Sequence, residues 1–165
     1  MTQFKDALKA LFRKSTHEST EEITLEDVTI DSAPLFTLPT VGLTKAKVLS
    51  VHDGDTLVAA IELFPGKFFS FPVRLSGIDT PELKPRLNIP NRESHIAAAK
   101  RARDFLADMV LGKVVSVQFE GIDRYGRQLG RIYLPGAENG VSINEMLLHR
   151  GYAAPYFGGT KQSSP

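Results

Sequence analysis

Residues 46–75, AKVLSVHDGDTLVAAIELFPGKFFSFPVRL, decide the fold of this chain of 165 residues. Three strand-like segments occupy the stretch: Ala46–Val51, Leu57–Leu63 and Phe69–Leu75. The first is an apolar, β-branched run, and in the other two apolar residues alternate with others, which is the period of a strand with one buried face. Asp53-Gly54 and Pro65-Gly66 separate the segments, and both pairs favour turns. The stretch therefore predicts three consecutive antiparallel strands.

One long helix, two further strands and a short helix are expected beyond this stretch. The pattern predicts the long helix over about Arg92 to Leu111 and strands near Val115–Phe119 and Gly130–Leu134. Ser142 and Glu145 form a capping box for the short helix. This order fits an α+β fold with a small antiparallel barrel of five strands and the long helix between strands three and four. An open sheet with helices on one face fits the pattern almost as well.

Charge and composition divide the chain into three parts. We expect a leader over residues 1–43, a barrel domain over residues 44–158 and a polar tail over residues 159–165. The leader combines a basic amphipathic helix, predicted over residues 3–14, with an acidic linker. The apolar stripe of that helix consists of Phe4, Ala7, Leu8, Leu11 and Phe12. The leader carries four basic and seven acidic residues, against sixteen and twelve in the rest. The positive balance of the domain is compatible with a polyanionic partner.

Composition excludes several classes of protein. The chain contains no cysteine, which excludes disulfides, thiolate metal sites and cysteine nucleophiles. No apolar stretch approaches the roughly 18 residues of a membrane span, and no signal-peptide core follows Met1. We therefore expect an intracellular monomer. Three roles stay open for the basic helix: docking on the protein itself or on a partner, attachment to a membrane surface, and organelle targeting.

Acidic and basic residues gather where the predicted strands end. The acidic residues lie in the first turn and just past the third strand: Asp53, Asp55, Asp79 and Glu82. Arg74 lies on the polar face of the third strand, and Arg127 lies in the turn before the fifth. Carboxylates suit a hard divalent cation, and guanidinium groups donate parallel hydrogen bonds to phosphate. Each motif alone is also an ordinary turn former. The histidines show no ligand spacing, so we expect His17, His52, His95 and His149 to be surface or core residues.

Three separated motifs resemble the staphylococcal nuclease family in order and spacing. They are Asp53-Gly54-Asp55-Thr56, Arg74-Leu75-Ser76-Gly77-Ile78-Asp79-Thr80-Pro81-Glu82 and Asp123-Arg124-Tyr125-Gly126-Arg127. The segment from Asn144 to Ala153 is similar to the C-terminal helix of that family. The resemblance implies an OB-fold barrel that hydrolyses phosphodiester bonds of DNA and/or RNA with calcium. An all-oxygen site does not strictly select calcium over magnesium or manganese.

The resemblance also implies roles for individual residues. Asp55 and Asp79 would bind the cation through their carboxylates, and Thr80 would bind it through its backbone carbonyl. Glu82 would be the general base, or would orient the attacking water. The scissile phosphate would be clamped by Arg74 and Arg127, the latter acting chiefly on the transition state. Such a reaction needs no covalent intermediate, which agrees with the lack of cysteine and of a serine–histidine pair.

Substrate contacts and the alternative function complete the sequence-based expectations. The nucleotide would be contacted by Tyr125, Arg124 and Tyr156, and Asp53 matches an acidic position at the edge of the site. The loop Leu83–Asn91 does not match the family closely. The alternative is an inactive domain of the same fold that binds nucleic acid or protein. Such a domain should have lost an arginine, the glutamate or a cation ligand, and this sequence retains all of them.

Overall fold

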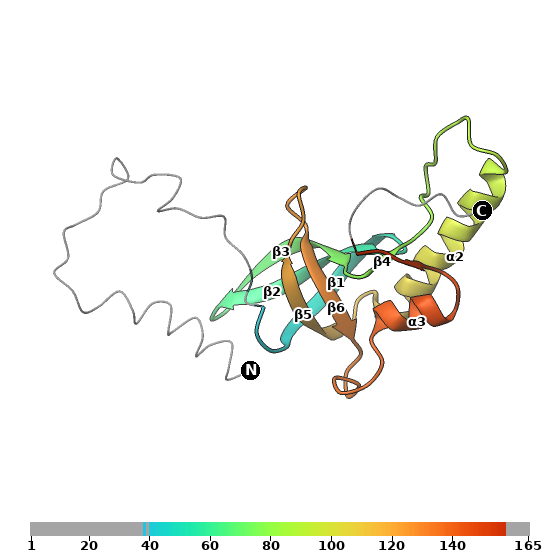
Figure 1. Ribbon diagram of the computed structural model, residues 1–165. Helices are drawn as coiled ribbons and strands as arrows, with labels where there is room; N and C mark the ends of the chain where they lie inside the picture. Colours follow the sequence, from blue (N-terminus) through green and yellow to red (C-terminus); the bar gives the residue numbers. More distant parts are fainter. Residues whose placement is uncertain (1–37, 39, 158–165) are drawn as a thin grey trace, which may run out of the picture.

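Five strands close into a barrel in the computed structural model, which describes Leu38 and residues 40–157 (Figure 1). They are β1 (Thr44–Asp53), β2 (Thr56–Phe64), β3 (Lys67–Leu75), β5 (Val114–Ile122) and β6 (Gln128–Tyr133). The strand order is β1-β2-β3-β6-β5, and β5 pairs with β1 to close the barrel. The predicted five-stranded barrel is confirmed, and closure excludes the open sheet.

One pair of strands departs from the antiparallel arrangement that the sequence predicted. β3 and β6 run parallel, with Arg74 opposite Leu129, whereas the other barrel pairs are antiparallel. Parallel neighbours need a long crossover connection. Here the chain between β3 and β6 contains a long helix and β5, which is enough chain to return to the same end of the barrel.

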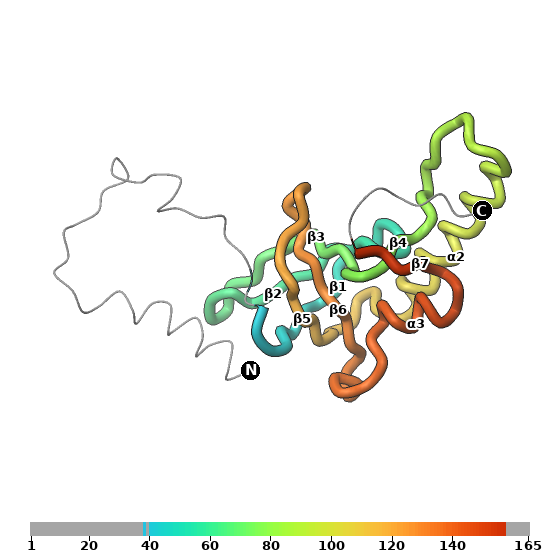
Figure 2. Tube along the Cα trace, viewed as in Figure 1, coloured from blue at the N-terminus to red at the C-terminus, as the bar shows by residue number. Residues whose placement is uncertain are grey.

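The long helix, the short helix and a small second sheet complete the described structure. α2 (Arg92–Val110) lies between the third and fourth barrel strands, as predicted, and α3 (Ile143–His149) follows the barrel. The capping box of α3 is present, since the side chains of Ser142 and Glu145 each accept a hydrogen bond from the other's backbone N–H. β4 (Ile78–Asp79) pairs with β7 (Ala154–Pro155), and the trace in Figure 2 shows β7 returning beside β4.

The core fills the barrel and the space beneath the two helices. Alternate residues of β2 are buried, as its pattern predicted, and they pack with apolar residues of both helices. The buried set includes Leu57, Ala59, Ile61, Val73, Leu75, Leu106, Val110, Ile143 and Leu147. Phe69 belongs to the same alternating set of β3 as Val73 and Leu75, but it is 44% exposed because it lies at the outer end of the hairpin.

The turn between β1 and β2 needs glycine for space. The backbone φ of Gly54 does not lie in the left-handed region. A Cβ atom at this position would lie 2.6 Å from the Cβ of Ala102 on α2 and 3.0 Å from the Cγ2 of Thr80. Contacts below about 3 Å between carbon atoms are repulsive, since the optimum is about 3.5–4.0 Å. The glycine therefore lets α2 and the chain after β4 pack directly against the turn that carries Asp55.

Several sequence-based expectations fall on residues that the structure leaves undescribed. The predicted leader helix over residues 3–14, the acidic linker as far as residue 37 and the tail from residue 159 lie outside the described residues. In the part that is described, no helix is both long and apolar enough to cross a membrane. His17 also lies outside the described residues. His52, His95 and His149 are exposed, which agrees with the expectation that they are surface or core residues.

Candidate active site

An open cleft of about 1490 Å³ lies at one end of the barrel, and all the residues predicted from the sequence line it. These are Asp53, Asp55, Arg74, Asp79, Thr80, Glu82, Arg124, Tyr125, Arg127 and Tyr156. They come from the β1–β2 turn, the end of β3, the segment that begins with β4, the β5–β6 turn and the residues after β7. Segments far apart in the sequence therefore supply one site.

The strand pairing explains why these segments meet. Thr56 pairs with Arg74 where β2 begins and β3 ends, which places Asp55 beside the arginine. The parallel pairing of β3 with β6 then brings the β5–β6 turn to the same end. The backbone N–H of Tyr156 donates to the carbonyl of Gly77 at 3.0 Å, so the chain after β7 completes the wall.

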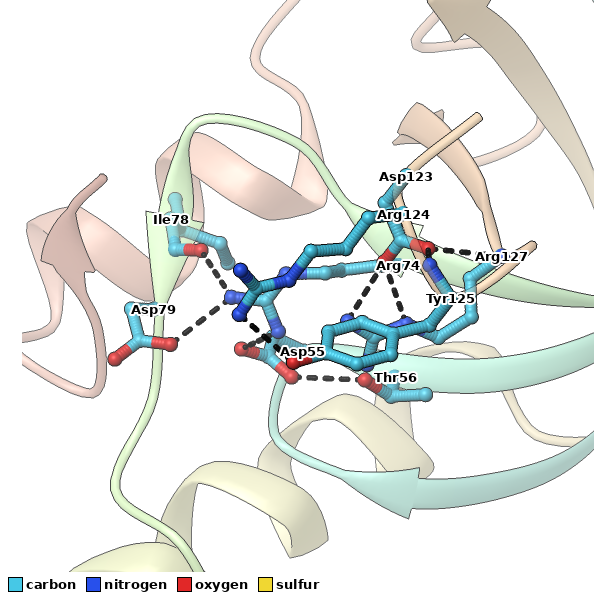
Figure 3. A network of polar contacts seen from close by, with 9 residues as sticks. All are labelled: Asp55, Thr56, Arg74, Ile78, Asp79, Asp123, Arg124, Tyr125 and Arg127. Atoms are coloured by element: carbon cyan, nitrogen blue, oxygen red, sulfur yellow. Dashed lines mark hydrogen bonds and ion pairs between the residues drawn. The ribbon is translucent and has the colours of Figure 1, made fainter. Parts of the chain in front are cut away.

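Arg74 is the centre of the polar network (Figure 3). Its Nη1 lies 2.8 Å from Oδ2 of Asp55, and its Nη2 lies 2.9 Å from Oδ1 of Asp79. Nη2 also donates to the carbonyl of Ile78 at 3.3 Å. The arginine side chain is only 15% exposed. Burial alone would lower the pKa of Arg74, but the charges of Asp55 and Asp79 outweigh burial and raise it. The guanidinium group thus stays charged and holds the two carboxylates together.

Asp55 is the most buried carboxylate of the network, with a side chain 6% exposed. Its Oδ1 accepts from Thr56 Oγ1 at 2.9 Å, and its Oδ2 accepts from the backbone N–H of Thr80 at 3.3 Å. Burial raises the pKa of Asp55 above its usual value, although Arg74 and these hydrogen bonds act in the opposite direction. A positive charge placed beside this carboxylate would therefore relieve an unfavourable burial.

Asp123 holds Arg127 in place, a contact that the sequence did not reveal. Its Oδ2 lies 2.7 Å from both Nε and Nη2 of Arg127. Its Oδ1 accepts from the backbone N–H groups of Tyr125 and Arg127 at 2.9 and 3.0 Å. Burial opposes ionisation of Asp123, but these four contacts prevail and lower its pKa. The sequence analysis gave Asp123 no role of its own, and the spacing of aspartate and arginine across a tight turn is the signal that could have identified the pair.

Two tyrosines place aromatic faces next to the arginines. Tyr125 is 68% exposed, and its ring centroid lies 4.8 Å from the guanidinium carbon of Arg124 and 5.5 Å from that of Arg127. Arg124 also donates to the Tyr125 hydroxyl at 2.8 Å. The ring of Tyr156 lies 5.9 Å from the guanidinium carbon of Arg74. Tyr125 is exposed and Tyr156 is half-buried, and aromatic rings beside cationic groups in a cleft suit the bases and phosphates of a nucleic acid.

Oxygen atoms make up the candidate donors for a cation. The carboxylates of Asp55 and Asp79 are brought together by Arg74, and Thr80 follows Asp79 directly in the chain. Within the described residues, no group of three or more histidine, cysteine, aspartate or glutamate side chains is arranged to hold a metal ion. Two carboxylates and a backbone carbonyl fit a hard cation whose remaining ligands are water and substrate oxygen. Glu82 lines the same cleft and is exposed.

Asn144 is a structural residue under the site that the motif analysis did not single out. It is 2% exposed, and its side chain accepts from the backbone N–H of Ile132 at 3.2 Å. It donates to the carbonyls of Ser76 and Gly130 at 2.9 and 3.1 Å. The side chain therefore ties α3 to β6 and to the turn between β3 and β4. Nothing in the sequence distinguishes this asparagine from a surface one.

Comparison with known proteins agrees with this arrangement. The family described as staphylococcal nuclease homologues matches residues 72–164. Among curated proteins, the chain is 32% identical over 110 residues to an uncharacterized endonuclease of Escherichia coli O157:H7. It is 32% identical over 117 residues to a micrococcal nuclease of Shigella flexneri. It is 40% identical over 86 residues to the staphylococcal-like nuclease CAN1 of Arabidopsis thaliana.

The coverage of these relatives is partial. The matches to the two bacterial proteins cover 67% and 68% of this chain and 60% and 58% of the relatives. The match to the Arabidopsis protein covers 52% of this chain and 22% of the relative. The chain therefore spans about three fifths of the length of the bacterial relatives.

Proposed function

The chain belongs to the family of staphylococcal nuclease homologues, and on that basis we propose that it is a nuclease. It hydrolyses phosphodiester bonds of DNA and/or RNA by calcium-assisted attack of water. The observation that carries the proposal is the convergence of two arginines, two aspartates and a glutamate on one cleft. Named relatives that are nucleases support the same activity.

Arg74 and Arg127 bind the scissile phosphate in this proposal. Planar guanidinium groups match phosphate oxygens through parallel hydrogen bonds. Both arginines are already oriented by carboxylates, Arg74 by Asp55 and Asp79 and Arg127 by Asp123. Donors fixed in advance stabilise the charge that develops at phosphorus without reorganising during the reaction. Arg127, whose side chain is 27% exposed, stays accessible to a phosphate in the cleft.

Asp55, Asp79 and the carbonyl of Thr80 are the residues that would hold the calcium ion. The donors are all oxygens, which is the preference of calcium, and the buried Asp55 carboxylate favours a nearby cation. A bound calcium ion supplies positive charge against the phosphate and makes a nearby water more acidic. Because Arg74 contacts both carboxylates, its guanidinium group and a cation are alternative partners for them.

Glu82 takes the proton of the attacking water, or orients that water. It lies in the segment after β4, two residues beyond Thr80, and its carboxylate is exposed in the cleft. A carboxylate close to a water can accept its proton in the transition state, which typically contributes 10²- to 10⁴-fold to a rate. Tyr125, Arg124 and Tyr156 contact the nucleotide beside the phosphate in this arrangement.

Digestion of plasmid and of single-stranded nucleic acid tests the proposed function. The purified chain should cleave with calcium and stop when a chelator is added. Glu82→Gln should cleave at least about 100-fold more slowly while it binds nucleic acid with unchanged affinity, because its proposed partner is the water. Arg103→Gln serves as the matched surface control, because among the described residues the ion pair of Arg103 is with the exposed Asp104. Undiminished cleavage in chelator would rule out a role of the cation in cleavage. Binding of nucleic acid without cleavage would favour the inactive binding domain.

A further inference from the structure

The β2–β3 hairpin carries exposed aromatic residues at the end that lies away from the cleft. Residues 64–70, FPGKFFS, are all exposed, and we call this run the aromatic tip. Its three phenylalanines are 43%, 67% and 44% exposed: Phe64, Phe68 and Phe69. The pairing of Phe64 with Lys67 closes the tip, whereas Arg74 lies at the other end of the hairpin. The tip projects from the barrel in Figure 1.

The phenylalanine side chains of the aromatic tip point to different faces of the hairpin, so they do not line a single groove. Phe68 and Phe69 are consecutive residues of a strand, so their side chains point to opposite faces. Phe69 contacts Phe64 edge-to-face, with ring centroids 6.2 Å apart. A helix packed on one face would therefore leave the other face in water. Immersion in an apolar medium covers both faces at once.

Basic residues accompany the aromatic tip. Lys67 is exposed within it, and Lys47 is exposed on the neighbouring strand, opposite Ala60. Glu62 accepts a hydrogen bond from the backbone N–H of Gly66 at 2.9 Å and so helps to close the turn. Phenylalanine and lysine together are typical of surfaces that bind the interface of anionic lipid.

The preceding chain reaches the barrel at the same end. Ala46 pairs with Ile61, so β1 starts beside the outer part of β2. Leu38, the first residue that the structure describes, is buried. Residues 1–14 carry a stripe of apolar side chains with four basic residues, Lys5, Lys9, Arg13 and Lys14. Such a segment has the composition of a peptide that lies on a membrane surface. The sequence upstream of the barrel thus contains a second segment with the composition of a membrane-binding surface.

We propose that the aromatic tip inserts into the interface of an anionic membrane. Arg74 lies seven positions after Lys67 along β3, which is roughly 23 Å at 3.3 Å per residue. The cleft therefore lies away from the lipid and stays open to a polymeric substrate in solution. This inference rests on the hairpin, and it holds or fails independently of the proposed function.

Co-sedimentation of the full chain with vesicles tests the inference. The vesicles contain phosphatidylcholine and phosphatidylglycerol in equal parts, or phosphatidylcholine alone. We expect binding to the anionic vesicles, and Phe68→Ser with Phe69→Ser should weaken it about tenfold, since burying one large apolar side chain is sufficient for such a factor. Leu87→Ser is the matched control, because Leu87 is 88% exposed in the loop before α2. The control should bind vesicles like the original chain, and cleavage in solution should be unchanged in every variant.

Several outcomes would overturn the inference. The full chain could remain in solution with anionic vesicles, or the double variant could bind as tightly as the original chain, which would leave residues 1–14 as the anchor. Loss of thermal stability in Phe68→Ser would show that the protein itself covers the tip. A dimer in size-exclusion chromatography that is lost in the double variant would show that a second copy covers it. Lys67→Glu gives a further test, because it should weaken binding only to the anionic vesicles.

Discussion

Replacing Arg74 by glutamine tests whether one guanidinium group neutralises the two carboxylates of the proposed cation site. The ion pairs of Arg74 measure 2.8 Å to Asp55 and 2.9 Å to Asp79. The side chain of Arg74 is 15% exposed, that of Asp55 is 6% exposed and that of Asp79 is 23% exposed. Removing one partner of a buried ion pair costs about 3–5 kcal/mol, and the partial exposure of Asp79 reduces the loss. We therefore expect Arg74→Gln to lower the free energy of unfolding by about 2–4 kcal/mol at neutral pH in chelator.

Calcium should restore much of this loss. An ion that binds only the folded state stabilises it by about 2.7 kcal/mol at a concentration 100 times its dissociation constant. In the original chain the guanidinium group occupies oxygens of both proposed carboxylate ligands, so calcium must compete with it. In the variant that competition is absent and the carboxylates repel each other. Calcium should therefore stabilise Arg74→Gln more than it stabilises the original chain.

Urea unfolding, followed by circular dichroism, measures both effects in chelator and in saturating calcium. Arg131→Gln is the matched control, because Arg131 pairs with Glu120 at 2.7 Å but both side chains are about one third exposed, 38% and 33%. Its substitution should cost at most about 1 kcal/mol, with no dependence on calcium. The reasoning is refuted if Arg74→Gln unfolds like the original chain in chelator, or if calcium stabilises the two equally.

Three further substitutions give separate tests. Arg127→Lys keeps the positive charge but loses the planar guanidinium fork, so in steady-state digestion kcat should fall about 10²- to 10³-fold with little change in KM. A near-normal kcat would contradict the role of Arg127 in the transition state. Gly54→Ala places a Cβ atom 2.6 Å from that of Ala102 and should lower stability by about 1–3 kcal/mol; an unchanged melting temperature would contradict the close packing. The hydrogen bond from Lys45 lowers the pKa of Glu138 to about 2, below its ordinary value of 4.5. The ionised Glu138 therefore stabilises the folded state above pH 4.5, and this stabilisation is lost as pH falls to about 2. The melting temperatures of Glu138→Gln and of the original chain should converge over that range. A difference that persists at the acidic end would contradict the assignment.

The barrel could be predicted from the sequence because each strand shows its own pattern. Alternation in β2 and β3 and the capping box of α3 are local features. The structure confirms the alternation in β2, the capping box and the second half of β3, where Val73 and Leu75 are buried. The parallel pairing of β3 with β6 is not a local feature, because it depends on the path that the chain takes between the two strands. The two-residue strands β4 and β7 are too short to carry a pattern, yet their pairing brings Tyr156 to the cleft.

Some features of the candidate site could likewise be predicted from the sequence, and others could not. Motif spacing predicted which residues lie at the cleft, because turns and strand ends gather at one end of a barrel. The partners of those residues could not be predicted. Alternation placed Arg74 on the polar face of β3, but it did not show that the arginine is largely buried between two carboxylates. Likewise the sequence analysis named Asp123 only as a member of a turn motif and gave it no role, although it holds Arg127.

The balance of charge in the cleft links the proposed cation to the proposed substrate. Arg74 with Asp55 and Asp79 forms a group with one more negative than positive charge, and Asp123 neutralises Arg127. The other charged residues that line the cleft carry one net positive charge: Asp53, Glu82, Lys84, Arg86 and Arg124. The cleft in this state is therefore close to neutral and offers a polyanion little net attraction. A divalent cation on the two carboxylates would reverse the sign of the first group and leave the guanidinium group of Arg74 for phosphate. On the proposed function, cation and nucleic acid must therefore strengthen each other's binding by the same factor, because coupling between two ligands is reciprocal.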